Sequence, residues 1–348
     1  MDSLSQMALG AAVSVAVMGR RTPLLRAALW GAACGTLPDL DALIDRGDAV
    51  RNMTLHRGET HALFYLSLAA PLIAAGIARL HRESRLFGRW WLATFLVLVT
   101  HPLLDSMTIY GTQLGLPFTN HPFGVGSIFI IDPLYTLPLL IGLGLAFGLQ
   151  HQQGLHGSLR WNLWGLGLSS LYLVWGVGVQ AHVRGVAEAA LRDRGQDFQR
   201  LLISPTAFNS VLWRVVAMDG EDYFEGFYSL LDPAREVHFD RFARDEDLAQ
   251  TLAAHDPVAR LVAFSHGYYA VQAVGDTARI SDLRMGQEPY YYFTFEVAQR
   301  GPQGWTPAAP KPVGSRPPSG PALRWLWQRL LARPEVSGSQ RLVPQQLD

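Results

Sequence analysis

The chain has 348 residues, of which 49% are hydrophobic and 17% charged, and 29 Lys and Arg balance 29 Asp and Glu. A formal net charge of zero leaves no global positive field, so nucleic acid is not an expected partner. The single cysteine, Cys34, excludes an intramolecular disulfide and a zinc site built from cysteines.

Apolar segments dominate the first half and predict an α-helical membrane domain over residues 1–185 with about six transmembrane helices. Four segments approach the roughly 20 apolar residues that cross a bilayer, namely 62–78, 90–109, 133–150 and 161–183. Two earlier segments, 4–18 and 24–37, are shorter and rich in Ala and Gly, which suits close helix packing better than contact with lipid. They are expected either to span the membrane or to form a re-entrant hairpin. Nothing before them is typical of a cleavable signal peptide.

Arginine in the connecting loops predicts the orientation of the helices. The loops after the first, third and fifth segments are rich in arginine, whereas residues 110–127 contain neither Lys nor Arg. Positive charge favours the cytoplasm, so the chain is predicted to be a multi-pass membrane protein whose arginine-rich loops lie on the cytoplasmic side. Its N-terminus, the 38–60 and 110–130 loops and the C-terminal domain are then expected on the non-cytoplasmic face.

Residues 195–300 are predicted to form a smaller soluble domain of α+β or mostly β structure. Strands are expected at 211–218, 223–230, 258–264, 268–274 and 290–297, with a hairpin turn at Asp219-Gly220. A helix is expected within 240–255. Residues 301–348 are interpreted as a Pro/Gly-rich linker up to 321, an amphipathic helix over 322–333 and a tail. That helix is expected either on the membrane surface or packed on its own domain.

Four short clusters of His and Asp lie at the edges of apolar segments. They are residues 38–41 (PDLD), 56–61 (HRGETH), 101–105 (HPLLD) and 131–133 (IDP). Charged groups at the edge of a hydrocarbon layer are costly, so their presence calls for a functional reason. The predicted topology brings all four clusters to one membrane face, as a single site requires.

The spacing within two clusters favours metal binding. His101 and Asp105 are four residues apart on a predicted helix and therefore share one face, although a simple hydrogen bond between packed helices would explain them too. His56 and His61 flank Gly58, whose flexible backbone allows a turn that directs both imidazoles to one centre.

The remaining acidic residues have simpler alternatives. Asp39 and Asp41 follow a proline, where Asp commonly forms turns and caps, yet one could bind metal while the other orients a histidine. Asp132 precedes Pro133 and, taken alone, is most simply a helix N-cap.

Together these residues suit one or two divalent transition-metal ions, and the mix of imidazole and carboxylate does not select among zinc, manganese, iron and nickel. We take zinc as the first expectation, with manganese or iron as alternatives. A bound metal makes water acidic enough to attack an ester or phosphoester. In that case Glu59 is the expected acid/base and Arg57 the expected anion clamp, although both also suit an ordinary surface. No nucleophile elbow, phosphate-binding loop or HExxH helix appears, which weighs against serine hydrolases, nucleotide hydrolases and zincin proteases.

The chain resembles the YdjM-like family of bacterial inner-membrane metal-dependent hydrolases. The resemblance lies in residues 1–6 (MDSLSQ), 35–41 (GTLPDLD), 56–61, 101–106 (HPLLDS), 110–112 (YGT), 117–118 (PF) and 131–133. It covers residues 1 to about 185, and segments 204–206, 212–214 and 281–284 extend it to about 297. One departure is Ala62, where a serine commonly follows the second histidine.

This resemblance implies a polytopic membrane protein with a metal-dependent hydrolase site at these His and Asp positions. The HRGxTH and HxxxD patterns also look like those of zinc-dependent phospholipase C enzymes, which by analogy favours a phosphoester or lipid substrate.

The sequence therefore predicts a membrane-embedded metal hydrolase that acts on a lipid or amphiphilic phosphoester or ester. The predicted ligands are His56, His61, His101 and Asp105, and Asp39, Asp41 and Asp132 are ligands or orienters. Two alternatives stay open: an ion or metal transporter, and a non-catalytic membrane scaffold that binds a protein partner. Membrane lipids are the expected partners, and the oligomeric state is not predicted.

Overall fold

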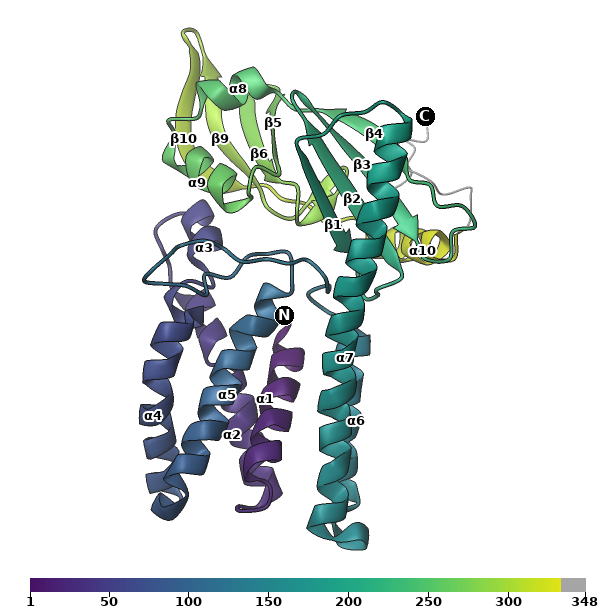
Figure 1. Cartoon of the computed structure of the whole chain (residues 1–348). Helices are drawn as coiled ribbons and strands as arrows, with labels where there is room; N and C mark the ends of the chain where they lie inside the picture. Colours follow the sequence, from purple (N-terminus) through teal and green to yellow (C-terminus); the bar gives the residue numbers. More distant parts are fainter. Residues whose placement is uncertain (333–348) are drawn as a thin grey trace. The chain divides into compact units, whose positions relative to one another are not determined.

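The computed structural model describes residues 1–332, which fall into two compact units (Figure 1). The first unit comprises Met1–Ile44, Arg57–Val177 and Ala207–Asn209, and the second comprises Asp45–His56, Gly178–Thr206 and the chain from Ser210 onward. Each unit has its own apolar core. The predicted tail, residues 333–348, lies outside the described residues.

Helices build the first unit. They are α1 (Ser3–Met18), α2 (Leu24–Thr36), α4 (Leu63–Leu80), α5 (Phe87–Ser106), α6 (Pro133–Gly148) and the first part of α7 (Gln150–Asp193). Three short 3-10 helices join them: η1 (Pro38–Leu43), η2 (Glu59–His61) and η3 (Ser84–Leu86). Helix α7 is broken at Gly154, where φ is 66° and the backbone leaves the helical region.

The predicted count of six membrane spans is not supported. Within the described residues, three helices are long and apolar enough to cross a membrane, at Leu63–Leu80, Ser84–Ser106 and Gly157–Asp193. Helices α1 and α6 are apolar but have 16 residues each, and α2 has 13. A helix of 16 residues is about 24 Å long, which falls short of the roughly 30 Å hydrocarbon layer. The coarser prediction of an apolar helical region followed by a sheet-rich domain is confirmed.

Glycine lets α1 and α2 approach closely. A Cβ on Gly10 would lie 2.3 Å from the Gly31 carbonyl oxygen, and a Cβ on Gly31 would lie 2.2 Å from that of Gly10. A Cβ on Gly35 would likewise lie 2.7 Å from the Gln6 carbonyl oxygen. The prediction that these Ala/Gly-rich segments suit close helix packing is therefore confirmed, and the structure shows that they pack against each other.

Two antiparallel four-stranded sheets form the centre of the second unit. One has the order β1-β2-β3-β4 and the other β10-β9-β6-β5. The strands are β1 (Arg200–Pro205), β2 (Leu212–Asp219), β3 (Asp222–Ser229), β4 (His238–Ala243), β5 (Tyr269–Val274), β6 (Thr277–Asp282), β9 (Thr294–Gly301) and β10 (Gly304–Pro312). A small ribbon, β7 (Gly286–Gln287) and β8 (Tyr290–Tyr291), and the helices α8 (Glu246–Thr251), α9 (Asp256–Phe264) and α10 (Ser319–Leu330) complete it. The end of α7 packs on the first sheet through Val183, Ala187 and Leu191.

Two sequence predictions for this unit were wrong, and a third was right only in part. Residues 258–264 form helix α9 instead of a strand, because Pro257 at the first turn starts a helix whose apolar residues recur on one face. Residues 304–312 of the predicted linker form β10, whose prolines are tolerated because β10 is an edge strand. The helix expected within 240–255 is present but shorter, as α8, because β4 continues to Ala243.

A segment of the predicted 38–60 loop belongs to the second unit. Residues 49–55 form α3 (Ala49–Leu55), which packs against α9 and β10, and Arg51 pairs with Asp256 at 3.2 Å. The chain therefore leaves the first unit after η1 and returns to it at Arg57.

Candidate metal centre

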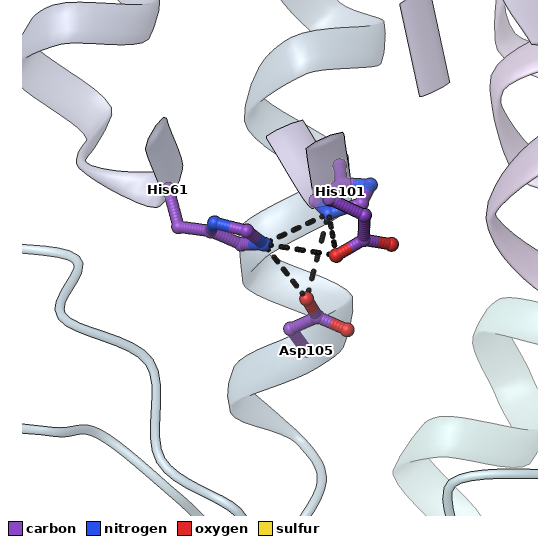
Figure 2. Close-up of side chains that lie close together, drawn as sticks. His61, His101 and Asp105 are labelled. Atoms are coloured by element: carbon purple, nitrogen blue, oxygen red, sulfur yellow. Dashed lines mark hydrogen bonds and ion pairs between the residues drawn. The ribbon is translucent and has the colours of Figure 1, made fainter. Parts of the chain in front are cut away.

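Four side chains of the first unit bring metal-binding atoms together. Asp39 comes from η1, His61 from η2, and His101 and Asp105 stand one turn apart on α5. One ligand atom from each residue lies within 4.8 Å of all the others. Figure 2 shows His61 and His101 directed toward each other, with Asp105 pointing to the same place.

Five of the six distances between these atoms are close to the edges of a tetrahedron around a metal ion. His61 Nε2 lies 3.1 Å from His101 Nε2, 3.2 Å from Asp39 Oδ1 and 3.4 Å from Asp105 Oδ2. His101 Nε2 lies 3.4 Å from Asp39 Oδ1 and 3.5 Å from Asp105 Oδ2. Bonds of about 2.0–2.2 Å to a tetrahedral zinc ion place neighbouring ligand atoms about 3.3–3.6 Å apart. The donor set and its spacing therefore fit a single zinc-sized ion.

Asp105 directs Oδ2 toward the other three donor atoms, whereas its Oδ1 contacts Gln6 and Met1. Oδ1 accepts a hydrogen bond from Gln6 Nε2 at 3.0 Å and pairs with the Met1 amino group. Oδ2 is buried and lies 3.3 Å from Arg57 Nε and 3.4 Å from His61 Nε2. A cation held between Asp105 and the two histidines would add a further positive charge beside this buried carboxylate.

Hydrogen bonds behind the histidines orient both rings. His101 Nδ1 lies 2.6 Å from the Gly35 carbonyl oxygen, so Nδ1 carries the proton and Nε2 presents its lone pair. His61 Nδ1 lies 3.0 Å from Thr60 Oγ1, and this hydroxyl donates to Asp41 Oδ2 at 2.9 Å. Both imidazoles therefore direct Nε2 to the same point, as metal-binding histidines do.

Burial and the neighbouring charges set the protonation of the two groups outside the membrane spans. Burial raises the pKa of Asp39, but hydrogen bonds to His101 and His61 outweigh it and hold that pKa below its usual range. Burial lowers the pKa of His61, but hydrogen bonds to Asp105 and Asp39 outweigh it and raise that pKa. Asp39 therefore supplies a negative charge that a cation would neutralise.

Arg57 supports the centre from behind Asp105. Its Nε lies 3.3 Å from Asp105 Oδ2, and its guanidinium lies over the Tyr110 ring. Its backbone N–H donates to Asp41 Oδ2 at 2.9 Å and its φ is 64°, a left-handed conformation that is costly for a non-glycine residue. The guanidinium is buried against its own protein, which favours a positioning role over the expected anion clamp.

The other predicted site residues have different positions. Asp41 stands behind His61 and is not one of the four clustered residues. His56 is the C-cap of α3 and is also outside the group. Asp132 caps α6 through Leu134 N and accepts a hydrogen bond from the Tyr172 hydroxyl at 2.8 Å, which confirms its simpler reading as an N-cap. Glu59 is exposed at the start of η2, and its acid/base role stays a prediction.

Some supporting groups were not predicted from the sequence. Gln6 lay within the family resemblance but received no role, and here it donates to Asp105 and to the His101 carbonyl oxygen. Thr60 separates two predicted residues and bonds His61. The role of the Gly35 carbonyl oxygen could not be predicted from the sequence, because every residue has a backbone carbonyl.

Comparisons with known proteins agree with the membrane character of the chain. The family model of the YdjM inner membrane protein matches residues 1–183. The uncharacterized protein YfhP of Bacillus subtilis (strain 168) is 25% identical over 286 residues, which cover 80% of this chain and 83% of YfhP. The inner membrane protein YbcI of Escherichia coli (strain K12) is 37% identical over 86 residues, which cover 24% of this chain and 49% of YbcI. No solved structure matches. With more than half of its length matched, the chain belongs to the YdjM inner membrane protein family.

Proposed function

We propose that this membrane protein is a metal-dependent hydrolase that acts on a lipid or amphiphilic phosphoester or ester. The observation that carries the proposal is the clustering of four donor atoms, from Asp39, His61, His101 and Asp105, within 4.8 Å of one another. A bound divalent ion, for which zinc suits the donor set best, would supply an acidified water for attack on the ester.

The chain's own residues define how a substrate would reach the site. The His61, His101 and Asp105 side chains are buried, whereas the Asp39 side chain is 21% exposed. Solvent and substrate therefore approach from the Asp39 side. Arg57 holds Asp105, and Thr60 with Asp41 holds His61, so the ligands keep their orientation while a substrate binds.

A stripe of leucines beside Asp39 supports an amphiphilic substrate. Leu37, Leu40 and Leu43 recur every third residue through η1, and side chains at this spacing lie above one another on a 3-10 helix. Their exposed fractions are 41%, 55% and 84%. His101 and Asp105 also lie in the last turns of a membrane-length helix, at the depth expected for lipid headgroups. Apolar contacts beside a polar site suit a molecule with an acyl chain and an ester group.

The test is hydrolysis of phospholipids by the purified, zinc-loaded protein in mixed micelles. Released phosphorylated headgroup, headgroup alcohol and fatty acid are measured for the parent, for His101→Ala and for His56→Ala, which removes a histidine outside the cluster. We expect activity in the parent and in His56→Ala and its loss in His101→Ala. A parent that holds metal but hydrolyses no phospholipid or ester would contradict the hydrolase and leave a structural metal.

A further inference from the structure

Helix α10 is amphipathic, and one face packs on its own domain (Figure 1). Trp325 is buried, with its ring 4.8 Å from that of Phe227 in an edge-to-face contact. Arg329 makes two hydrogen bonds of 2.7 Å to the carboxylate of Asp232. The Ser229 hydroxyl donates to the Leu330 carbonyl oxygen at 2.7 Å. These contacts fix the orientation of the helix, and with it the direction of its other face.

The opposite face of α10 exposes large apolar side chains. Leu323, Trp327 and the following Leu331 are spaced by four residues, and their exposed fractions are 53%, 63% and 39%. Leu231, which is 55% exposed, lies beside the end of α10, because its N–H donates to the same Ser229 hydroxyl. Such a continuous apolar stripe on a soluble surface indicates a contact with something apolar.

The charge beside this stripe is positive. Arg324 is exposed and follows Leu323 directly, whereas Arg329 is neutralised by Asp232. From Ser319 to Ala332 the sequence contains no acidic residue. A leucine and tryptophan stripe bordered by arginine is complementary to an anionic lipid surface, where indole rings settle at the headgroup level and arginine meets phosphate.

The second unit, which carries α10, is joined to a membrane-length helix. The membrane-length segment Gly157–Asp193 continues as one helix into the second unit, so a membrane-spanning segment tethers that unit covalently. A tethered surface acts at high effective concentration, so even a short apolar stripe suffices to hold it. We propose that Leu323, Trp327 and Leu331 of α10 insert into the headgroup layer of an anionic membrane. This role goes beyond the proposed hydrolysis and does not depend on a metal.

The test places a spin label on the exposed face without removing the apolar residues. Gly320 lies on that face, and a Cβ there would meet nothing within 4 Å, so Gly320→Cys in a Cys34→Ala background provides the attachment site. Gln299→Cys, on an exposed position of β9, is the matched control. Both full-length proteins are reconstituted in nanodiscs of phosphatidylethanolamine and phosphatidylglycerol. Collision of each label with oxygen and with a water-soluble nickel chelate is measured by power saturation.

We expect the label at 320 to collide severalfold less with the chelate and more with oxygen than the label at 299. Adding Leu323→Asp and Trp327→Asp to the protein labelled at 320 should abolish this protection. Without these two substitutions, nanodiscs of phosphatidylcholine alone should weaken the protection. Equal chelate collision at both positions would contradict the proposal. Dipolar broadening at 320 would assign the face to a second copy of the chain and would overturn the proposal as well.

Discussion

The imidazoles of His61 and His101 face each other with 3.1 Å between their Nε2 atoms, although 40 residues separate them in the chain. Each Nδ1 already has an oxygen partner, Thr60 for His61 and the Gly35 carbonyl for His101. Two Nε2 lone pairs at this distance repel unless a proton or a cation lies between them. With Asp39 and Asp105 beside them, a divalent cation satisfies all four groups at once.

Removing the hydroxyl behind His61 should weaken metal binding. Thr60→Val deletes the oxygen that links His61 Nδ1 to Asp41, so the ring loses its fixed orientation. We expect metal affinity to fall about 10–100-fold, as is typical when a partner behind a ligand is lost. Competition with a fluorescent chelator measures it, and Thr60→Ser, which keeps the hydroxyl, should retain most of the affinity. Unchanged affinity in Thr60→Val would show that Thr60 does not orient His61.

Enlarging a glycine between α1 and α2 should destabilise the first unit. In Gly31→Ala the new Cβ would lie 2.2 Å from the Gly10 carbonyl oxygen, so the two helices must move apart. We expect a loss of about 1–3 kcal/mol or more, the usual range for overpacking. Gly76→Ala on α4 is the matched control, because its Cβ meets nothing within 4 Å and alanine favours a helix by about 1 kcal/mol. The midpoint of thermal unfolding in detergent should fall for Gly31→Ala alone.

Glu288 should make the stability of the second unit depend on pH. Burial raises the pKa of Glu288, which also accepts a hydrogen bond from the Tyr223 hydroxyl. A carboxyl whose pKa is higher in the folded than in the unfolded protein stabilises the fold below its unfolded pKa. This stabilisation is lost as the pH rises through the folded pKa.

Glu288→Gln keeps an oxygen for Tyr223 and removes the charge. We therefore expect the variant to be more stable than the parent at neutral pH, with the difference shrinking as the pH falls toward 4.5, the ordinary pKa of glutamate. Thermal unfolding at several pH values compares the two proteins. If the parent is at least as stable as the variant at neutral pH, the negative charge of Glu288 does not destabilise the folded protein.

The sidedness of the membrane helices is predicted from arginine in the loops. The 110–127 loop contains neither Lys nor Arg, and its Asn120 is exposed. Asn120→Cys in a Cys34→Ala background should react with a membrane-impermeant maleimide in intact cells whose outer membrane is permeabilised. Labelling only after lysis would place this loop, and the metal centre with it, on the cytoplasmic face.

The parts of the site that follow a regular spacing could be predicted from the sequence. His101 and Asp105 are four residues apart on a helix, and the structure places both in the metal group. The short clusters outside helices were harder. Asp39 and Asp41 are equivalent in sequence, and only the turn of η1, which buries Asp41, distinguishes the clustered residue from the one behind His61. His56 differs from His61 because it is the last residue of the segment Asp45–His56, which belongs to the second unit.

The fold, too, could be predicted only in part from the sequence. Hydrophobicity locates the apolar helices correctly. It also led us to predict α1, α2 and α6 as membrane spans, although these helices are short for crossing a bilayer. Local composition also favoured a linker where β10 lies, because it does not reveal that an edge strand of a sheet tolerates proline. Both errors arise where packing against a neighbour, and not the local sequence, decides the structure.

The most direct test of the metal centre is the metal content of the protein purified in detergent, measured by mass spectrometry. The parent and His56→Ala should each hold about one equivalent of a transition metal, whereas His61→Ala and His101→Ala, matched for folding, should hold none. Absence of metal from the parent after incubation with zinc and manganese would contradict the metal centre, and so would retention of the metal by His101→Ala.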